Sequence, residues 1–230
     1  MVVNSLADNS DTALHELGHA LSLGRSMYPG ERESIVHVPY TFASNEIAGN
    51  DIDTAFDNSI STKLQCRGGT DPNGCKSYQY STNRLPNMNI DQAATDWMVR
   101  PNFRNGLEMD RSNTETDEVR YQHRGHAKYA DMARIMGDWQ WMSEAYLMES
   151  FDIEAGSSSL PTCADNLEDS DKRTFRFSLK ACVDFTPIVH FWGIQPVNEL
   201  ALAECMAQNN IPSSPAIKAQ LEHYSTIVPP

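Results

Sequence analysis

The sequence lacks several features that would assign it quickly to a class of protein. No apolar run approaches the roughly 18 residues that a membrane-spanning helix requires. The N-terminus has no basic stretch followed by an apolar core, so we expect no signal peptide within this chain. Internal repeats and low-complexity segments are also missing. These absences exclude a membrane-spanning protein at the level of the sequence.

Positive charge is scarce as well. The chain has 18 Lys and Arg residues against 31 Asp and Glu residues, which gives a net charge of −13. Such an excess of negative charge argues against nucleic acid and against anionic membrane surfaces as partners. Hydrophobic residues make up 40% of the 230 positions, which is enough for a sizeable core in one large domain or two small ones.

Alternation of apolar and polar residues with a period of two is weak, so we expect few strands. The sequence predicts a mainly α-helical fold with long irregular loops. The aromatic and Met residues of 129–151 have helical spacing and are interpreted as core. The residue Pro187 must bend or end the helix in which it lies. Helices are expected at 52–64, 90–99, 125–137, 139–151, 175–191, 197–207 and 216–223, and irregular segments at 66–87 and 104–118.

The strongest chemical motif is His15-Glu16-Leu17-Gly18-His19, which has the pattern H-E-x-x-H within an apolar run from 12 to 23. On an α-helix, residues four apart share a face, so His15 and His19 can bind one ion. Two imidazoles and an oxygen ligand suit Zn²⁺ and leave a position open for water. Glu16 is then placed to accept a proton from that water, as in peptide hydrolysis.

The flanking residues favour a helix here. Asn9, Ser10 and Asp11 are suitable N-caps, and Gly24 can end the helix in the left-handed conformation. Ala13, Leu14, Leu17 and Leu21 are expected to be buried or half-buried together with the two His residues. Gly18 lowers helix propensity, which indicates a close approach by another element or by substrate.

A third zinc ligand must come from elsewhere in the chain. Ser22 and Arg25 stand where the metzincin pattern requires Gly and His, so that pattern fails. Glu31 and Glu33 follow the turn Pro29-Gly30, and a returning helix can present either carboxylate to the metal.

With these residues, the sequence resembles the M60-like, or enhancin-type, zinc metallopeptidases, whose pattern is H-E-x-x-H, a variable gap and then E-x-x-V-N. Residues 33–37 read E-S-I-V-H and match that segment, with His37 where Asn is usual. The resemblance implies Glu33 as the third ligand, after a gap of thirteen residues from His19. His37 could compete as a nitrogen ligand, but a supporting or structural role is favoured.

Softer resemblances lie further along the chain. The segments 121–129 and 191–194 are similar to stretches of bacterial relatives. Tyr121, His123 or His126 could stabilise the oxyanion that forms at the scissile carbonyl, although a solvated loop explains them equally well. His190 is interpreted as a core or interface residue.

The family would also place a β-rich subdomain before the zinc helix, where an edge strand binds the substrate backbone. Only fourteen residues precede His15, so we expect that this subdomain of the parent protein is missing from the chain. That expectation leaves open a non-catalytic module that binds metal and glycan or protein, or an inactive fragment of a peptidase.

Five cysteines indicate the compartment. Cys66 and Cys75 flank a turn-rich spacer and are predicted to form a disulfide, which implies an oxidising environment. Any two of Cys163, Cys182 and Cys205 could pair, and the sequence does not choose between them.

The sequence thus predicts a zinc-dependent endopeptidase that is secreted or at the cell surface of a bacterium. Residues 1–155 are expected to form the zinc-binding catalytic helical region, and residues 156–230 a C-terminal helical region packed on it. The resemblance implies extracellular glycoprotein or mucin-like substrates.

Overall fold

The computed structural model describes Leu14, residues 17–20, Ser22, and residues 25–28, 35–61, 89–98 and 121–228. Within these residues the protein is mainly α-helical and contains no strand, as the sequence predicts. None of the helices described is both long and apolar enough to span a membrane. The predicted loops at 66–87 and 104–118, and the predicted disulfide between Cys66 and Cys75, lie outside the described residues.

The helices follow one another with short connections. In the first half these are a 3₁₀ turn η2 (Ile35–His37), α2 (Val38–Phe42), a π-helical turn η3 (Ala43–Ile47), α3 (Ile52–Ser61) and α4 (Ile90–Trp97). The second half contains α6 (Tyr121–Met136), α7 (Gln140–Ala155), a 3₁₀ turn η6 (Thr162–Asn166), α8 (Asp169–Ala181), α9 (Thr186–Phe191), α10 (Glu199–Gln208) and α11 (Pro215–Ile227).

Side-chain caps fix several of the helix starts. Asn89, Asn198 and Ser214 each accept a hydrogen bond from the backbone N–H three residues later, at the starts of α4, α10 and α11. At the other end of α7, Gly156 takes the left-handed conformation with φ +62°. That conformation costs glycine little and allows the chain to leave the helix.

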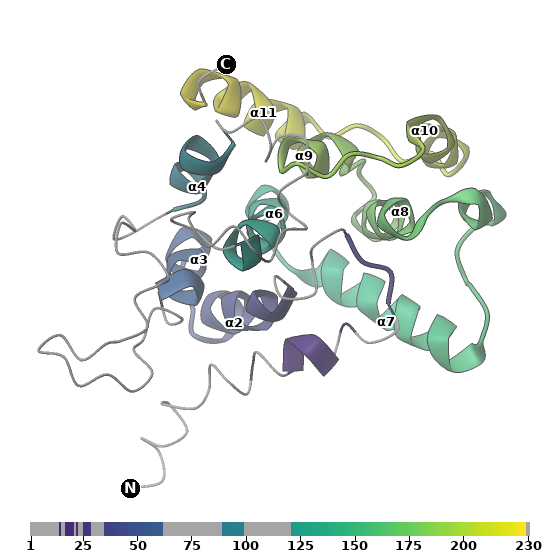
Figure 1. The fold of residues 1–230 in the computed structure, drawn as a ribbon, viewed down its shortest axis with the longest axis horizontal. Helices are drawn as coiled ribbons and strands as arrows, with labels where there is room; N and C mark the ends of the chain where they lie inside the picture. The colour runs from purple at the N-terminus through teal and green to yellow at the C-terminus, as the bar shows by residue number, and fades with distance from the viewer. Residues whose placement is uncertain are drawn as a thin grey trace, which may run out of the picture.

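The helix α6 is the centre of the fold, with α2, α3, α4, α9 and α11 packed around it (Figure 1). Its buried face carries Tyr129, Met132 and Ala133, as helical spacing predicts. Trp139, Trp141 and Met142 are also buried, so the interpretation of the segment 129–151 as core is confirmed. The same core includes residues from the C-terminal half: Phe177, Phe185, Ile188, Trp192 and Tyr224. Both predicted regions therefore contribute to it.

The predicted helix 175–191 is wrong as a single element. The structure has α8 from Asp169 to Ala181 and a separate α9, with Cys182 left-handed at φ 55° between them. Pro187 occupies the first turn of α9, where its missing N–H costs nothing. Asp184 supports that start by accepting a hydrogen bond from the N–H of Thr186 at 2.8 Å.

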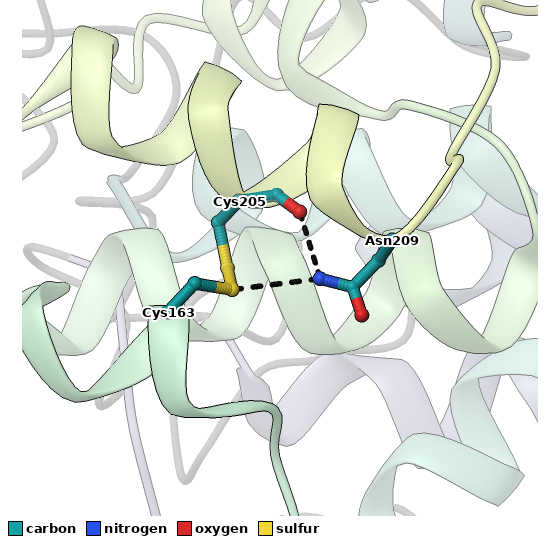
Figure 2. The surroundings of a disulfide bond; sticks show 3 residues. All are labelled: Cys163, Cys205 and Asn209. Carbon is teal, nitrogen blue, oxygen red and sulfur yellow. Dashed lines mark hydrogen bonds between the residues drawn. A yellow bond between two sulfur atoms is a disulfide. The ribbon is translucent and has the colours of Figure 1, made fainter.

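A smaller hydrophobic cluster lies between η6, α8 and α10. It contains Leu160, Ala164, Leu167, Phe175, Leu202, Cys205 and Met206. A disulfide joins Cys163 to Cys205 across it, and the Asn209 side chain donates to the Cys163 sulfur and to the Cys205 carbonyl (Figure 2). Cys182 is exposed and outside a disulfide. The structure therefore makes the pairing that the sequence left open.

Candidate functional site

The described part of the H-E-x-x-H segment is helical. Leu14, residues 17–20 and Ser22 have helical backbone, whereas His15 and Glu16 lie outside the described residues. Gly18 and Ser22 are buried and Leu14 is half-buried, so the stripe at i, i+4 and i+8 faces the protein. His19 is half-buried on the neighbouring face. The expectation that Leu17 is buried is wrong, since it is 46% exposed.

The chain leaves this helix through contacts that fix its end. The Ser22 hydroxyl donates to the His19 carbonyl at 2.8 Å, and the Arg25 N–H donates to the Ser22 carbonyl at 3.3 Å. Arg25 then reaches α7, where its guanidinium donates to the Tyr146 carbonyl at 2.7 Å and stacks on the Tyr146 ring. These contacts set the position of His19 relative to α7.

Glu149 of α7 is the anchor of this segment. It is 5% exposed and accepts from the N–H of Ser26 at 2.9 Å. It also pairs with Arg25 at 3.5 Å and with Arg176 of α8 at 2.7 Å. One buried carboxylate thus ties the residues that follow the H-E-x-x-H helix to two other helices. We name Glu149, Arg25 and Arg176 the Glu149 network.

Beyond Ser26, the chain enters a buried group of aromatic rings and cations. Tyr28 is 2% exposed, and its hydroxyl is 3.0 Å from that of Thr174. Lys128 lies 5.0 Å from the Tyr28 ring centre and 4.6 Å from that of Tyr129. Arg173 packs against the same two rings and donates to the Tyr146 hydroxyl at 2.9 Å. Cation–π contacts of this kind stabilise charge that has been removed from water.

The predicted third ligand, Glu33, and its alternative Glu31 lie outside the described residues. The structure resumes at Ile35, which is buried, and His37 follows it at 1% exposure. The His37 ring stacks on His126 of α6 with centroids 5.1 Å apart, and the other face of the fold contributes Phe56 at 5.0 Å from His126. This packing supports the structural interpretation of His37.

The oxyanion candidates are at the start of α6. Tyr121 and His123 belong to its first turn by backbone, and their side chains are not described. The alternative of a solvated loop is wrong, because this segment is helical. His126 is 0% exposed and lies 3.3 Å from the Thr41 hydroxyl, so it serves the core. His190 is exposed, which contradicts the expected core position.

A second buried charge group lies on the far side of α6, and it is one that the sequence did not indicate. Asp131 is 0% exposed, accepts from the Trp192 indole at 2.8 Å and pairs with Arg134 at 3.0 Å. Arg134 also pairs with Asp91 at 2.9 Å, and Asp91 contacts His223 at 2.7 Å. We name Asp131, Arg134, Asp91 and His223 the Asp131 network.

Burial and charge act differently on the two carboxylates of this network. Removal from water raises the pKa of Asp131 above its ordinary value, although Arg134 and Trp192 oppose the change. Partial burial also acts to raise the pKa of Asp91, but the hydrogen bond to His223 and the charge of Arg134 outweigh it and lower that pKa. Both groups belong to the packing of α4, α6 and α11, and neither has a catalytic signature.

Among the described residues, no group of three or more His, Cys, Asp and Glu side chains is arranged to hold a metal ion. Because His15 and Glu33 lie outside those residues, the predicted zinc site stays a prediction. The donor set itself, two imidazoles and one carboxylate, suits Zn²⁺. Comparison with known proteins found no matching family model, curated protein or solved structure.

Proposed function

We propose that this protein is a zinc-dependent endopeptidase of the H-E-x-x-H…E type, with a helical catalytic region like that of other zincins. The observation that carries the proposal is the H-E-x-x-H motif on a segment whose described part is helical. Helical backbone at 17–20 supports the four-residue spacing that lets His15 and His19 share one ion. Burial of Gly18 and Ser22 supports a helix held by one face, with position 19 on the next.

The proposed roles follow from the chemistry of each side chain. His15, His19 and Glu33 would hold Zn²⁺, which when bound polarises a peptide carbonyl and acidifies water. Glu16 accepts the proton of the attacking water and delivers it to the leaving amine. Tyr121 or His123 donates a hydrogen bond to the carbonyl oxygen as negative charge develops there. The Glu149 network keeps His19 at a fixed place relative to α7.

The substrate class and location rest on the resemblance to enhancin-type peptidases. We propose extracellular glycoproteins, mucin-like ones among them, as substrates of a secreted or surface protein. The disulfide between Cys163 and Cys205 supports an oxidising compartment.

The deciding experiment combines metal content with cleavage. We expect about one zinc per chain, which is lost on His19→Ala and strongly weakened by Glu33→Ala but not by Glu31→Ala. Glu16→Gln should keep zinc and abolish cleavage of a mucin-type glycoprotein, because a general base is not a ligand. Glu46→Gln is the matched control, since Glu46 is exposed on η3.

The outcomes separate the alternatives. Equal zinc in the original protein and in His19→Ala would remove the site altogether. Zinc that is present without cleavage of either glycosylated or plain proteins would favour a non-catalytic binding module or an inactive fragment. Restored cleavage on adding an upstream β subdomain would identify a truncated peptidase.

A further inference from the structure

An apolar cavity of about 330 Å³ lies beside the H-E-x-x-H helix, between that helix, α2 with η3, and the start of α7. It is distinct from the predicted ligand positions, because it touches positions 14, 17 and 18 of the helix rather than 15 and 19. Its remaining lining residues are Ile35, Val38, Pro39, Phe42, Ala43, Ile47, Trp139, Met142, Ser143 and Tyr146.

The depth of the cavity comes from its inner wall. Ile35, Val38, Trp139 and Met142 are all 5% exposed or less, so the cavity reaches into the core rather than lying flat on the surface. Its outer edge is also apolar, since Leu17 is 46% and Ile47 78% exposed. An apolar group that enters therefore meets apolar side chains from the rim to the floor.

The lining offers little to a polar ligand. Among its side chains, Ser143 carries a hydroxyl at the exposed edge, and the Tyr146 hydroxyl already accepts a hydrogen bond from Arg173. A peptide backbone would need partners for its N–H and C=O groups, which such walls do not supply. Desolvating a charge there would be costly.

Size narrows the ligand further. Apolar cavities of about 150 Å³ accept benzene, and small-molecule sites begin at about 300 Å³. We propose that this cavity is a binding site for a small, uncharged, apolar molecule of about two fused aromatic rings. The bound molecule bridges the H-E-x-x-H helix, α2 with η3, and α7, and this inference does not depend on the proposed peptidase activity.

The test uses 5-fluoroindole as the uncharged probe and 5-fluoroindole-3-acetate as its charged analogue, followed by fluorine NMR on the full chain. The uncharged probe should bind saturably with one site, and the charged analogue at least about tenfold more weakly, as expected from desolvation of its carboxylate. A rise in melting temperature that saturates with the probe should accompany binding.

Two variants that fill the cavity locate the site. Ala43→Leu and Ser143→Leu each place a larger side chain at the cavity wall, and each should weaken binding of 5-fluoroindole by about tenfold or more through lost space. Ala155→Leu, at the exposed end of α7, is the control that should bind like the original protein. Circular dichroism identifies any variant that fails to fold, and the other filling variant then decides.

Failure of the probe to saturate would overturn the proposal. So would equal binding to Ala155→Leu and to a folded filling variant, because the probe would then occupy another place. Binding of the charged analogue as tight as that of 5-fluoroindole would also contradict an apolar site.

Discussion

The two buried charge networks have opposite compositions. The Glu149 network has one carboxylate between two arginines, and the carboxyl and both guanidinium side chains are 6–9% exposed. The Asp131 network has one arginine among Asp131, Asp91 and the more distant Asp53, with exposure from 0% at Asp131 to 37% at Asp53. A shared carboxylate and a shared guanidinium make each network depend on a different residue.

The difference also separates what the networks hold. The Glu149 network attaches the segment after the H-E-x-x-H helix to α7 and α8, next to the proposed site. The Asp131 network joins α4, α6 and α11 at the opposite end of the core (Figure 1). We therefore expect damage to the first to affect both stability and the proposed site, and damage to the second to affect stability alone.

The largest effect is expected from Glu149→Gln. It leaves Arg25 and Arg176 buried without their shared negative charge, which should cost about 3–5 kcal/mol of the free energy of unfolding. Urea denaturation compared with Glu154→Gln, an exposed position on the same helix, measures this cost. A loss below about 1 kcal/mol would show that Asp152, 3.7 Å from Arg176, replaces the missing charge.

Arg134→Met should cost about 3 kcal/mol at pH 7, because it leaves Asp131 charged in the core. Burial already raises the pKa of Asp131, and loss of Arg134 raises it further. A raised folded-state pKa favours the native protein below the ordinary carboxyl pKa and loses that contribution as the pH rises. The cost of Arg134→Met should therefore shrink when the pH falls from 7 to 4.

Urea denaturation at both pH values measures this change, and Lys218→Met is the matched control, since the Lys218 side chain is 79% exposed. A cost that is the same at pH 4 and pH 7 would mean that Asp131 does not carry the effect.

A moderate effect is expected from Arg25→Met, about 1–2 kcal/mol. The variant loses the hydrogen bonds to α7, but Glu149 keeps Arg176 at 2.7 Å. This substitution sharpens the comparison, because the Glu149 network has a second cation and the Asp131 network has no second arginine among its described members. A cost as large as that of Glu149→Gln, measured in the same way, would show that the two arginines are not interchangeable.

The smallest effect is expected from His223→Gln, below about 1 kcal/mol. The His223 and Asp91 side chains are 44% and 35% exposed, so water screens their contact. The hydrogen bond from His223 helps to keep the pKa of Asp91 low, and that stabilisation is present above the ordinary carboxyl pKa and lost as the pH falls through the lowered value. The two proteins should therefore converge in stability near pH 3, which thermal melts across pH would detect.

Helix positions were largely predictable, because their causes are local. The apolar spacing around Tyr129 and the caps Asn89, Asn198 and Ser214 lie within a few residues of the elements that they define. The break after Ala181 was missed, since apolar spacing continued through it and Pro187 was taken to act later. The helical backbone around Gly18 was predicted, whereas His15, Glu16 and Glu33 lie outside the described residues.

The sequence by itself determined the helical class, most helix bounds and the proposed chemistry at residues 15–19. Tertiary structure decided that Cys163 pairs with Cys205, that Glu149 and Asp131 are buried charges, and that His190 is exposed. The physical reason is range. Helix propensity and capping act between neighbours in the chain, whereas burial and pairing depend on segments far apart in sequence, which only the packed fold brings together.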